Sequence, residues 1–345
     1  MSILSTNIIR DLSGNNKVLT GGFYKADPST VAFTKTGNST AQIKAGTIVP
    51  LSNGSQVAFN SATNITMPTL VAGTDYAVWV NPDRTIQATA NFITPPQVGA
   101  RRIGGFHYAP GGNAAARAGG DTSAQINEYS FWDIKHRASC SDPRGMTLVA
   151  DGFWSDIYLC GVDHHINGTS KYNVTIADGS APPKLPALFG GNGTLTYADG
   201  NWWNFAEVGR SYGKRLPTYS EFSALAYGTT EATSSGGTDV PTTGASGTGA
   251  TSAWNLFTSK WGVVQSTGCL YIWGDEFGGG AAGASWSANT QGRGSTYQME
   301  NALLLGGSWD NTSISGSRCS SWNGAASYSS NSIGSRFVCD HLSLE

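Results

Sequence analysis

Short apolar runs separated by Gly, Asn and Pro dominate the first third of the chain. Four of these runs are rich in β-branched and aromatic residues, a composition typical of strands; they occupy residues 31–34, 42–45, 47–49 and 76–80. A fifth run alternates apolar and polar residues over 85–90, directly after Asn81-Pro-Asp-Arg84, where proline stands at the second position of a turn. The pattern predicts a hairpin at this turn and a small β-sandwich over residues 21–130.

The pattern changes near residue 130, and ten of the eleven tryptophans lie beyond this point. Two helices are predicted. One covers residues 202–210 after Asn201, and the other begins at the capping box Thr218-Tyr-Ser-Glu221 and ends at Gly228. Further short runs predict strands at residues 261–264, 269–273, 303–305 and 336–339. Since strands and helices do not alternate regularly, we expect an α+β domain over residues 131–345.

Two long polar segments interrupt this second region. Residues 229–253 contain almost no large apolar side chain and predict a long loop or insertion. In the segment at about 306–336, eleven of the 28 residues from Ser308 to Ser335 are serine. Such a composition is typical of disorder, but Trp309, Trp322 and Tyr328 lie inside the segment and favour an ordered framework.

Composition and charge restrict the class of function. The net charge is −2 and aromatic residues make up 11% of the chain, so the chain as a whole should fold. No cluster of Lys and Arg is present, which argues against a nucleic-acid partner. No apolar run approaches the ~18–20 residues that span a bilayer, so no membrane insertion is expected. The first residues also lack the pattern of a secretory signal.

Candidate chemistry is sparse. The five cysteines, at positions 140, 160, 269, 319 and 339, show no regular spacing and predict reduced, mostly buried thiols. His164-His165 is a candidate for a metal site, but adjacent side chains on a strand point to opposite faces, which favours ordinary histidines. The acidic pair Asp275-Glu276 is more typical of a solvated turn or a structural cation site than of paired acid and base. The sequence therefore predicts no catalytic residue and no cofactor, and leaves a structural metal open.

Five motifs in the C-terminal half resemble, in chain order, the landmarks of the formylglycine-generating-enzyme branch of the C-type lectin fold. They are Gly213-Lys-Arg-Leu-Pro-Thr218 with Glu221-Phe222, Cys269-Leu-Tyr-Ile-Trp-Gly-Asp275, Gly306-Gly-Ser-Trp309, Gly316-Ser-Arg318 and Gly334-Ser-Arg336. The resemblance implies a C-type lectin-like fold for residues 131–345.

A longer resemblance, from about Phe23 to Glu345, is to the major tropism determinant family of phages. It is carried by residues 25–27, 43–49, 105–110, 142–150, 236–243 and 338–342. It implies a receptor-binding protein at the tip of a phage tail fibre, made in the host bacterial cytoplasm and present in the virion as an intertwined homotrimer. The implied partners are a host-cell surface receptor, expected to be a protein, and other tail-fibre proteins. The family also has an N-terminal β-prism, for which residues 1–20 are too few, so we expect a reduced attachment segment there.

The resemblance also implies that a diversity-generating retroelement rewrites the last segment of the chain. The expected receptor-binding, variable positions are Ser308, Asp310, Asn311, Thr312, Ile314, Ser321, Asn323, Gly324, Tyr328, Ser330, Ser332 and Ile333. The expected fixed scaffold is Trp309, Gly316, Arg318, Trp322, Gly334 and Arg336. Because 308, 310, 312 and 314 alternate, as do 328, 330 and 332, we expect each set to project from one side of an extended segment. Small polar residues around a few aromatic ones are typical of an adaptable, antibody-like surface.

Three alternatives remain. A formylglycine-generating-type oxidase needs a close cysteine pair, whereas Cys319 and Cys339 are twenty residues apart. A calcium-dependent lectin needs a Glu-Pro-Asn or Gln-Pro-Asp tripeptide, and the sequence has neither. The twelve positions could also be ordinary solvated loop residues. The family resemblance favours the receptor-binding protein over all three.

Overall fold

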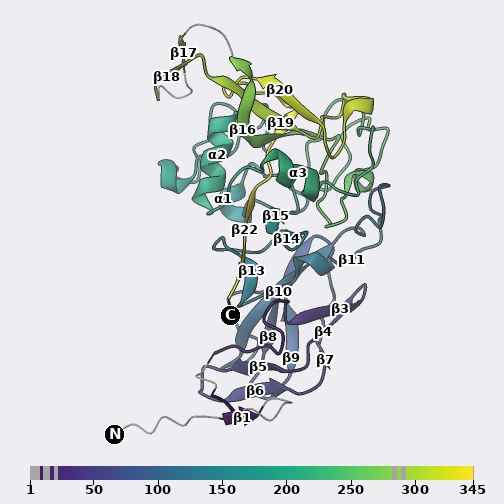
Figure 1. The fold of residues 1–345 in the computed structure, drawn as a ribbon, viewed down its shortest axis with the longest axis vertical. Coiled ribbons are helices and arrows are strands. Elements are labelled where there is room, and N and C mark those ends of the chain that lie inside the picture. Colours follow the sequence, from purple (N-terminus) through teal and green to yellow (C-terminus); the bar gives the residue numbers. More distant parts are fainter. Residues whose placement is uncertain (1–7, 11–15, 19–21, 282–285, 289–292, 345) are drawn as a thin grey trace.

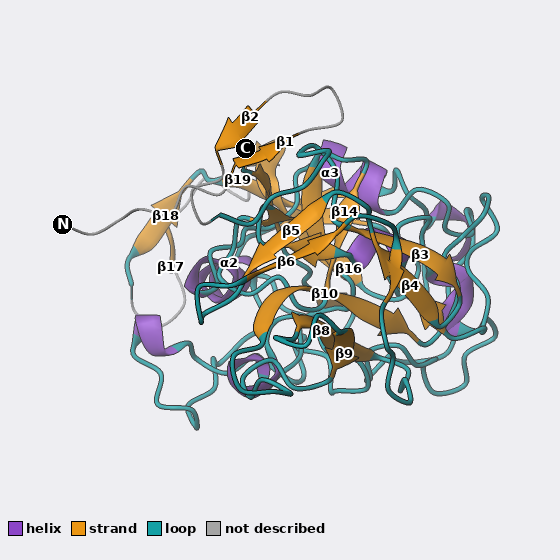
Figure 2. Ribbon diagram, turned by 90° about the horizontal axis from the view of Figure 1, so that it is seen from below, coloured by secondary structure: helices purple, strands orange, loops and turns teal. Residues whose placement is uncertain are grey.

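The structure is a computed structural model that describes residues 8–10, 16–18, 22–281, 286–288 and 293–344. Two lobes are stacked along its long axis (Figure 1). The N-terminal lobe, residues 22–133, lies at the bottom of that view, and the C-terminal lobe, residues 134–344, lies at the top. Strands and loops make up most of the chain and the helices are few and short (Figure 2), as the short apolar runs predicted. Among the described residues, no helix has the length and apolar character needed to cross a bilayer.

The N-terminal lobe consists of short antiparallel strands. They are β3 (Phe33–Gly37), β4 (Thr40–Ile43), β5 (Thr47–Pro50), β6 (Gln56–Phe59), β7 (Thr63–Asn64), β8 (Thr74–Val80), β9 (Ile86–Thr89), β10 (Arg101–Ala109), β11 (Gln125–Ile126) and β12 (Trp132–Asp133). The largest sheet has the order β11-β10-β8-β9, with β12 also paired to β10. One apolar core reaches from Phe23 to Phe131. The Arg84 N–H donates to the Asn81 carbonyl at 3.0 Å, which closes the predicted turn between β8 and β9.

The segment predicted for fibre attachment, residues 1–20, lies largely outside the described residues. Its described parts are β1 (Ile8–Arg10) and β2 (Asn16–Val18), which pair antiparallel.

The C-terminal lobe contains two four-stranded sheets. The first has the order β13-β22-β15-β14 and comprises β13 (His136–Ala138), β14 (Met146–Val149), β15 (Phe153–Asp156) and β22 (Val338–Ser343). The second has the order β20-β19-β16-β21 and comprises β16 (Tyr271–Ala281), β19 (Glu300–Leu305), β20 (Ser320–Gly324) and β21 (Ile333–Gly334). A small hairpin of β17 (Trp286–Ala288) and β18 (Ser295–Tyr297) lies at the upper end of Figure 1.

Local capping explains where the two predicted helices begin. In α2 (Trp202–Ser211) the Asn201 side chain accepts a hydrogen bond from the Asn204 N–H. In α3 (Tyr219–Leu225) Thr218 and Glu221 form the predicted capping box. Among the described residues, the other helical segments are α1 (His164–Asn167) and the single turns η1 (Glu128–Ser130), η2 (Ala187–Phe189), η3 (Trp254–Phe257) and η5 (Thr312–Ile314).

One predicted strand, residues 261–264, is wrong. The chain forms turns there, although Val263 and Val264 are buried. Gly262 has a φ of +77°, which no strand residue adopts, and a Cβ at that position would lie 2.5 Å from the Asn127 amide nitrogen. A short buried apolar run does not distinguish a strand from a buried loop.

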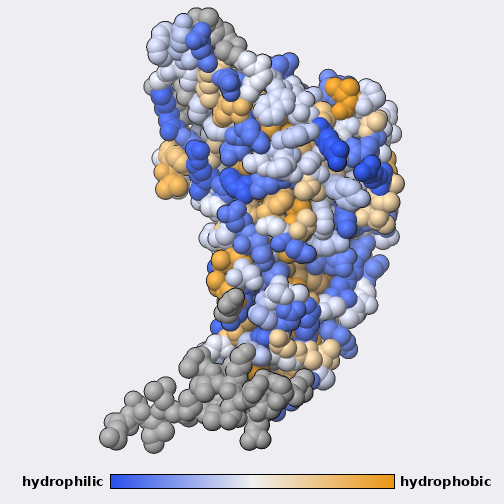
Figure 3. All heavy atoms as spheres, viewed as in Figure 1, coloured by the Kyte–Doolittle hydropathy of each residue, from blue (hydrophilic) through white to orange (hydrophobic). Residues whose placement is uncertain are grey.

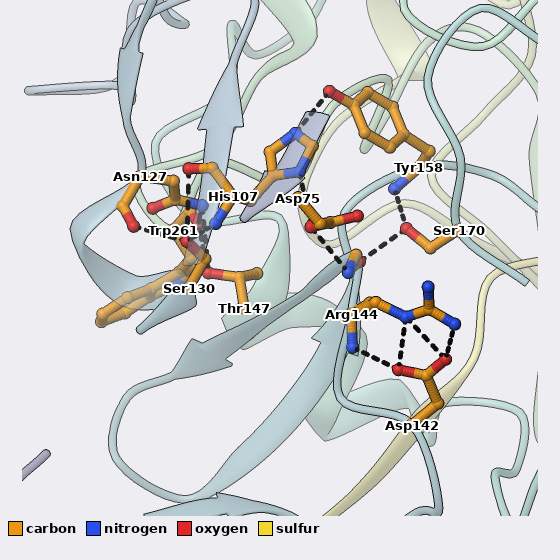
Figure 4. A network of polar contacts seen from close by, with 11 residues as sticks. Asp75, His107, Asn127, Ser130, Asp142, Arg144, Thr147, Tyr158, Ser170 and Trp261 are labelled. Carbon is orange, nitrogen blue, oxygen red and sulfur yellow. Dashed lines mark hydrogen bonds and ion pairs between the residues drawn. The ribbon is translucent and has the colours of Figure 1, made fainter. Parts of the chain in front are cut away.

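Buried polar side chains join the two lobes (Figure 4). His107 on β10 places Nδ1 2.9 Å from the Asp75 carboxylate on β8 and Nε2 2.9 Å from the Tyr158 hydroxyl of the C-terminal lobe. Asn127 donates to the Trp261 carbonyl at 3.0 Å, again across the junction. His107, Asn127 and Tyr158 are each at most 1% exposed, so these contacts are shielded from water and fix one lobe against the other.

Candidate binding surface

The segment 306–336 supplies both edges of the second sheet. Its strand β20 pairs with β19, so that Ser320 lies opposite Leu305, and β21 runs parallel to β16, so that Ile333 lies opposite Tyr271. Between these strands the chain forms two loops, residues 306–319 and 325–332. The serine-rich segment is therefore part of a folded sheet rather than a disordered tail.

The first loop is held by the insertion at 229–253, which supplies hydrogen bonds to its backbone. Ser234 Oγ donates to the Trp309 carbonyl at 2.6 Å, and the Gly236 N–H donates to the same oxygen at 3.0 Å. The Thr312 N–H in turn donates to Ser234 Oγ at 3.2 Å. The polar composition of the insertion thus has a structural cause, because its side chains and amides satisfy a neighbouring loop.

Glu231, at the start of the same insertion, fixes the end of the first loop. Its carboxylate accepts hydrogen bonds from the Ser317 N–H at 2.9 Å and from Ser317 Oγ at 2.5 Å. A Cβ at Gly316 would lie 2.3 Å from a Glu231 oxygen, so glycine leaves room for this carboxylate. Sequence reasoning missed Glu231, whose only signal was that it is one of two acidic residues, with Asp239, in the polar stretch 229–253.

The second loop rests on backbone that precedes α2. The Gly179 N–H donates to the Ser330 carbonyl at 3.0 Å, and the Gly200 N–H donates to Ser329 Oγ at 3.0 Å. The Trp202 N–H donates to the Ala326 carbonyl at 3.1 Å. Most of these contacts again hold the backbone of the loop, while the Ser330 and Ser332 hydroxyls contact each other at 2.9 Å.

The predicted scaffold residues fall into three groups. Trp309, Gly316, Gly334 and Arg336 are buried, and Trp322 is half-buried. Trp322 lies over a glycine pair, since a Cβ at Gly278 would be 3.0 Å from its ring. The Arg318 side chain is exposed. Its backbone carbonyl accepts a hydrogen bond from the Tyr219 hydroxyl at 3.1 Å.

Arg336 anchors the end of the segment from inside the lobe. Its side chain is fully buried and donates to the carbonyls of Asp156 at 2.8 Å and Ile157 at 2.6 Å, as well as to those of Val264 and Gln265. Burial lowers the pKa of this guanidinium to about 9. The hydrogen-bond acceptors of this buried cation are backbone carbonyl oxygens rather than a carboxylate.

Nine of the twelve predicted variable positions are exposed or half-exposed, and three are buried. The nine are Asp310, Asn311, Thr312, Ile314, Ser321, Asn323, Tyr328, Ser330 and Ser332. Ile314 and Tyr328 are the large residues among them, at 62% and 52% exposure. We call these nine positions the exposed variable set.

The surface location expected for Ser308, Gly324 and Ile333 is wrong. Ser308 is 2% exposed, and its hydroxyl donates within the loop to Asp310 and Asn311. Gly324 is covered by Leu304, which a Cβ there would approach to 3.2 Å. Ile333 is 1% exposed and belongs to the apolar core beneath α2.

The expected alternation along extended segments is also wrong. Residues 309–310 form a turn and residues 312–314 form the single turn η5, with Thr312 at a φ of +43°. Residues 328–332 are coil and turn rather than strand. The side chains reach the surface because both loops curve over the sheet edge.

Tyr271 is a fixed residue among these loops that sequence reasoning missed. The Ser332 carbonyl accepts from its N–H at 2.9 Å, and its phenol contacts the Cys319 thiol. Burial, together with the neighbouring Cys319 and Asp310, raises the pKa of Tyr271 to about 12, so the phenol is neutral at physiological pH. It offers a half-buried aromatic ring between the two loops.

The histidine and acidic pairs have ordinary partners. His164 is 1% exposed, with its ring nitrogens 3.1 Å from the Tyr212 hydroxyl and 2.7 Å from the Lys184 carbonyl. Glu276 accepts hydrogen bonds from the Tyr219 N–H at the start of α3. Within the described part of the chain, no three His, Cys, Asp or Glu side chains gather closely enough to hold a metal ion.

The two cysteines considered for an oxidase lie in different surroundings. Cys319 contacts Tyr271 at the loop surface, whereas Cys339 contacts Cys140 in the first sheet. The surface of the C-terminal lobe seen in Figure 3 is mainly hydrophilic, with scattered hydrophobic residues. Its chemistry is that of an adaptable polar contact surface.

Comparisons with known proteins agree with one another. Residues 31–133 match a family model described as the second domain of Mtd. Over 326 residues the chain is 64% identical to the tail fiber receptor-binding protein of Bordetella phage BPP-1, covering 94% of this chain and 85% of that protein. The solved P3c variant of the major tropism determinant is 61% identical and superposes with a TM-score of 0.93, covering 97% of this chain and 90% of that one. The M1 variant is 60% identical with the same TM-score of 0.93, covering 99% and 93%.

Proposed function

Because the chain belongs to the major tropism determinant family of phage tail-fibre proteins, we propose that it attaches a phage to its host by binding a cell-surface receptor. The binding surface is the exposed variable set, with Tyr271 between its two loops. The observation that carries this assignment is a separation of roles. Backbone groups hold both loops, while the side chains of the nine positions face solvent.

This separation makes the surface tolerant of substitution. The Trp309 carbonyl accepts two hydrogen bonds that do not depend on any variable side chain. Ser330 is held by its carbonyl, which every residue possesses. We infer that rewriting of the nine positions by a diversity-generating retroelement changes what is bound and leaves the C-type lectin-like fold intact.

Small polar side chains give each binding surface a modest affinity. Tyr328 and Tyr271 are the two large aromatic groups in the exposed variable set and Tyr271 taken together. We infer that the protein is a homotrimer at the fibre tip, where several copies of the surface raise the effective affinity through avidity. The receptor expected for such a surface is a protein, because a wide polar face with few anchors resembles an antibody paratope.

The test is adsorption of a phage carrying this chain to the strain that it infects. Replacing all nine positions of the exposed variable set by Ala should reduce the adsorption rate at least tenfold while the thermal melt of the purified protein stays close to that of wild type. The control replaces exposed polar residues of the N-terminal lobe, Ser52, Asn53, Asn60 and Ser61, by Ala. Equal adsorption of the nine-position variant and wild type would overturn the assignment of the surface.

A further inference from the structure

Two buried cysteines from distant parts of the chain lie just beyond the end of the β13–β22 pairing. In the β13–β22 pair, His136 faces Ser343, Arg137 faces Leu342 and Ala138 faces His341. The Ser139 N–H donates to the Asp340 carbonyl at 3.0 Å, so the register continues past the end of β13. The next pair in this register is Cys140 and Cys339.

The position of this pair in the ladder brings the side chains together. Lys135 and Leu344 are hydrogen-bonded, as are Ser139 and Asp340, so every second pair between them is of the hydrogen-bonded kind. Cys140 and Cys339 therefore form a non-hydrogen-bonded pair, for which the Cα atoms lie about 4.5 Å apart. That separation is within the range of about 4.4–6.8 Å that disulfides span. The two thiols lie close enough for each to shift the pKa of the other, and the Cys140 thiol donates to the Asp142 carbonyl at 3.2 Å.

The surroundings of the pair combine an apolar wall with one cation. Trp132, Met146, Leu148 and Trp154 pack around the two cysteines. The ammonium of Lys214 lies close enough to influence both thiols and is itself buried against Asp156 at 2.6 Å. A cation beside a thiol favours the thiolate, which is the reactive form.

A small cavity is lined by residues that neighbour this site. It has a volume of about 150 Å³, and Asp142, Tyr212 and Lys214 are among its lining residues. The Cys140 thiol donates a hydrogen bond to the carbonyl of Asp142 at 3.2 Å, so this thiol contacts one residue of the cavity lining. A water molecule takes about 30 Å³, and a peroxide molecule of comparable size fits such a space.

We propose that Cys140 and Cys339 form an oxidation site that reacts with hydrogen peroxide to give a disulfide between β22 and the segment that follows β13. The proposal stands on the fold alone and does not depend on the receptor-binding function. No other two of the five cysteines are in contact among the described interactions.

Cys339 is the residue that attacks first. The neighbouring Cys140 and Lys214 lower the pKa of Cys339 to about 7, whereas the neighbouring Cys339 and burial raise the pKa of Cys140. The Cys339 thiolate attacks one peroxide oxygen, the O–O bond breaks, and the departing hydroxide takes up a proton to leave as water. The Cys140 sulfur then attacks the Cys339 sulfenic acid. Its S–H proton and the sulfenic hydroxyl leave as a second water, so two thiols are oxidised and one peroxide is reduced to two waters.

The experiment treats the purified, folded protein with a small excess of hydrogen peroxide and then counts free thiols after denaturation. We expect the count to fall from five to three, and non-reducing peptide mapping to show one linked pair containing Cys140 and Cys339 with a mass loss of 2 Da. Because the bond joins residues far apart in sequence, the melting temperature should rise by roughly 5–10 °C and return on reduction.

Matched variants identify the site. The Cys319→Ser variant removes the half-exposed thiol and should still form the link, whereas Cys140→Ser and Cys339→Ser should not form it or show the shift in melting temperature. If wild type keeps both thiols free while Cys319 oxidises, or if a link forms between other cysteines, the proposal is wrong. The mass and thiol count of wild type decide the question even if a serine variant folds poorly.

Discussion

The exposed loops are fixed mainly through their backbone, whereas the interior that supports them is fixed mainly through side chains. In the loops at 306–319 and 325–332, backbone carbonyls and amides make many of the contacts with the rest of the lobe, whereas the hydrogen bonds described for the nine exposed side chains stay within the segment 306–336. At Arg336 and at the junction around His107, side chains make the contacts and are almost fully buried. The comparison teaches where substitution is tolerated: a position can change freely when its backbone, and not its side chain, carries the structure.

The largest loss of stability is expected for Arg336→Met, which tests the contribution of a buried side chain. The change removes a buried cation and leaves four carbonyl oxygens that had accepted its hydrogen bonds without a donor. At about 1–3 kcal/mol for each unsatisfied buried group, with partial relaxation, we expect a loss of about 5 kcal/mol in the free energy of unfolding. Urea denaturation measures it. Arg318→Met, at the exposed scaffold arginine, is the control and should change stability by less than about 0.5 kcal/mol.

Trp309→Ala tests the apolar side of the frame. Trp309 is 7% exposed and packs in the core with α3, so its truncation should lower the free energy of unfolding by about 3–5 kcal/mol. Trp322→Ala removes a half-buried ring over Gly278 and should cost about half as much. Chemical denaturation of both variants gives the ratio of the two losses in the free energy of unfolding. Equal losses would show that burial does not set the cost at these two positions.

Acidification should lower the free energy of unfolding, because the interior contains a buried histidine that is kept neutral. Burial and the neighbouring His341 lower the pKa of His136 to about 3, so the folded protein keeps this imidazole neutral. The unfolded chain binds a proton near pH 6.5, and stability contributed by the neutral ring is therefore complete above that pH and falls as the pH drops towards 3. One proton changes the free energy by about 1.4 kcal/mol per pH unit, so about 2 kcal/mol is lost by pH 5. Thermal melts from pH 7 to 5 measure the slope, which His136→Gln should flatten.

The smallest effect on stability is expected at Tyr328, which is 52% exposed. Tyr328→Ala should change the free energy of unfolding by less than about 0.5 kcal/mol, as for other surface positions, and yet reduce phage adsorption several-fold because it removes an aromatic contact. Asn323→Ala is the matched polar change in the same surface. A large loss of stability at either position would contradict the view that these side chains do not support the fold.

Local sequence signals were sufficient to predict where the two main helices begin. Asn201 and the capping box at Thr218 and Glu221 placed both main helices, because a cap is satisfied within one turn. The surface could not be predicted as well. Gly324 is buried by Leu304 and Ile333 by its pairing with β16, and neither neighbour is close in sequence. Likewise, only the folded structure shows that Glu231 and Ser234 hold the loop at residues 306–319.

The place of β22 in the first sheet has a consequence for how the chain is made. Residues 338–343 lie between β13 and β15, so this sheet lacks an interior strand until the ribosome has translated β22. A stop codon or frameshift anywhere upstream of β22 would leave β13 and β15 with unpaired edges and an exposed apolar face. Such a product would be prone to aggregation. Only a chain that is read through to β22 can therefore complete this sheet.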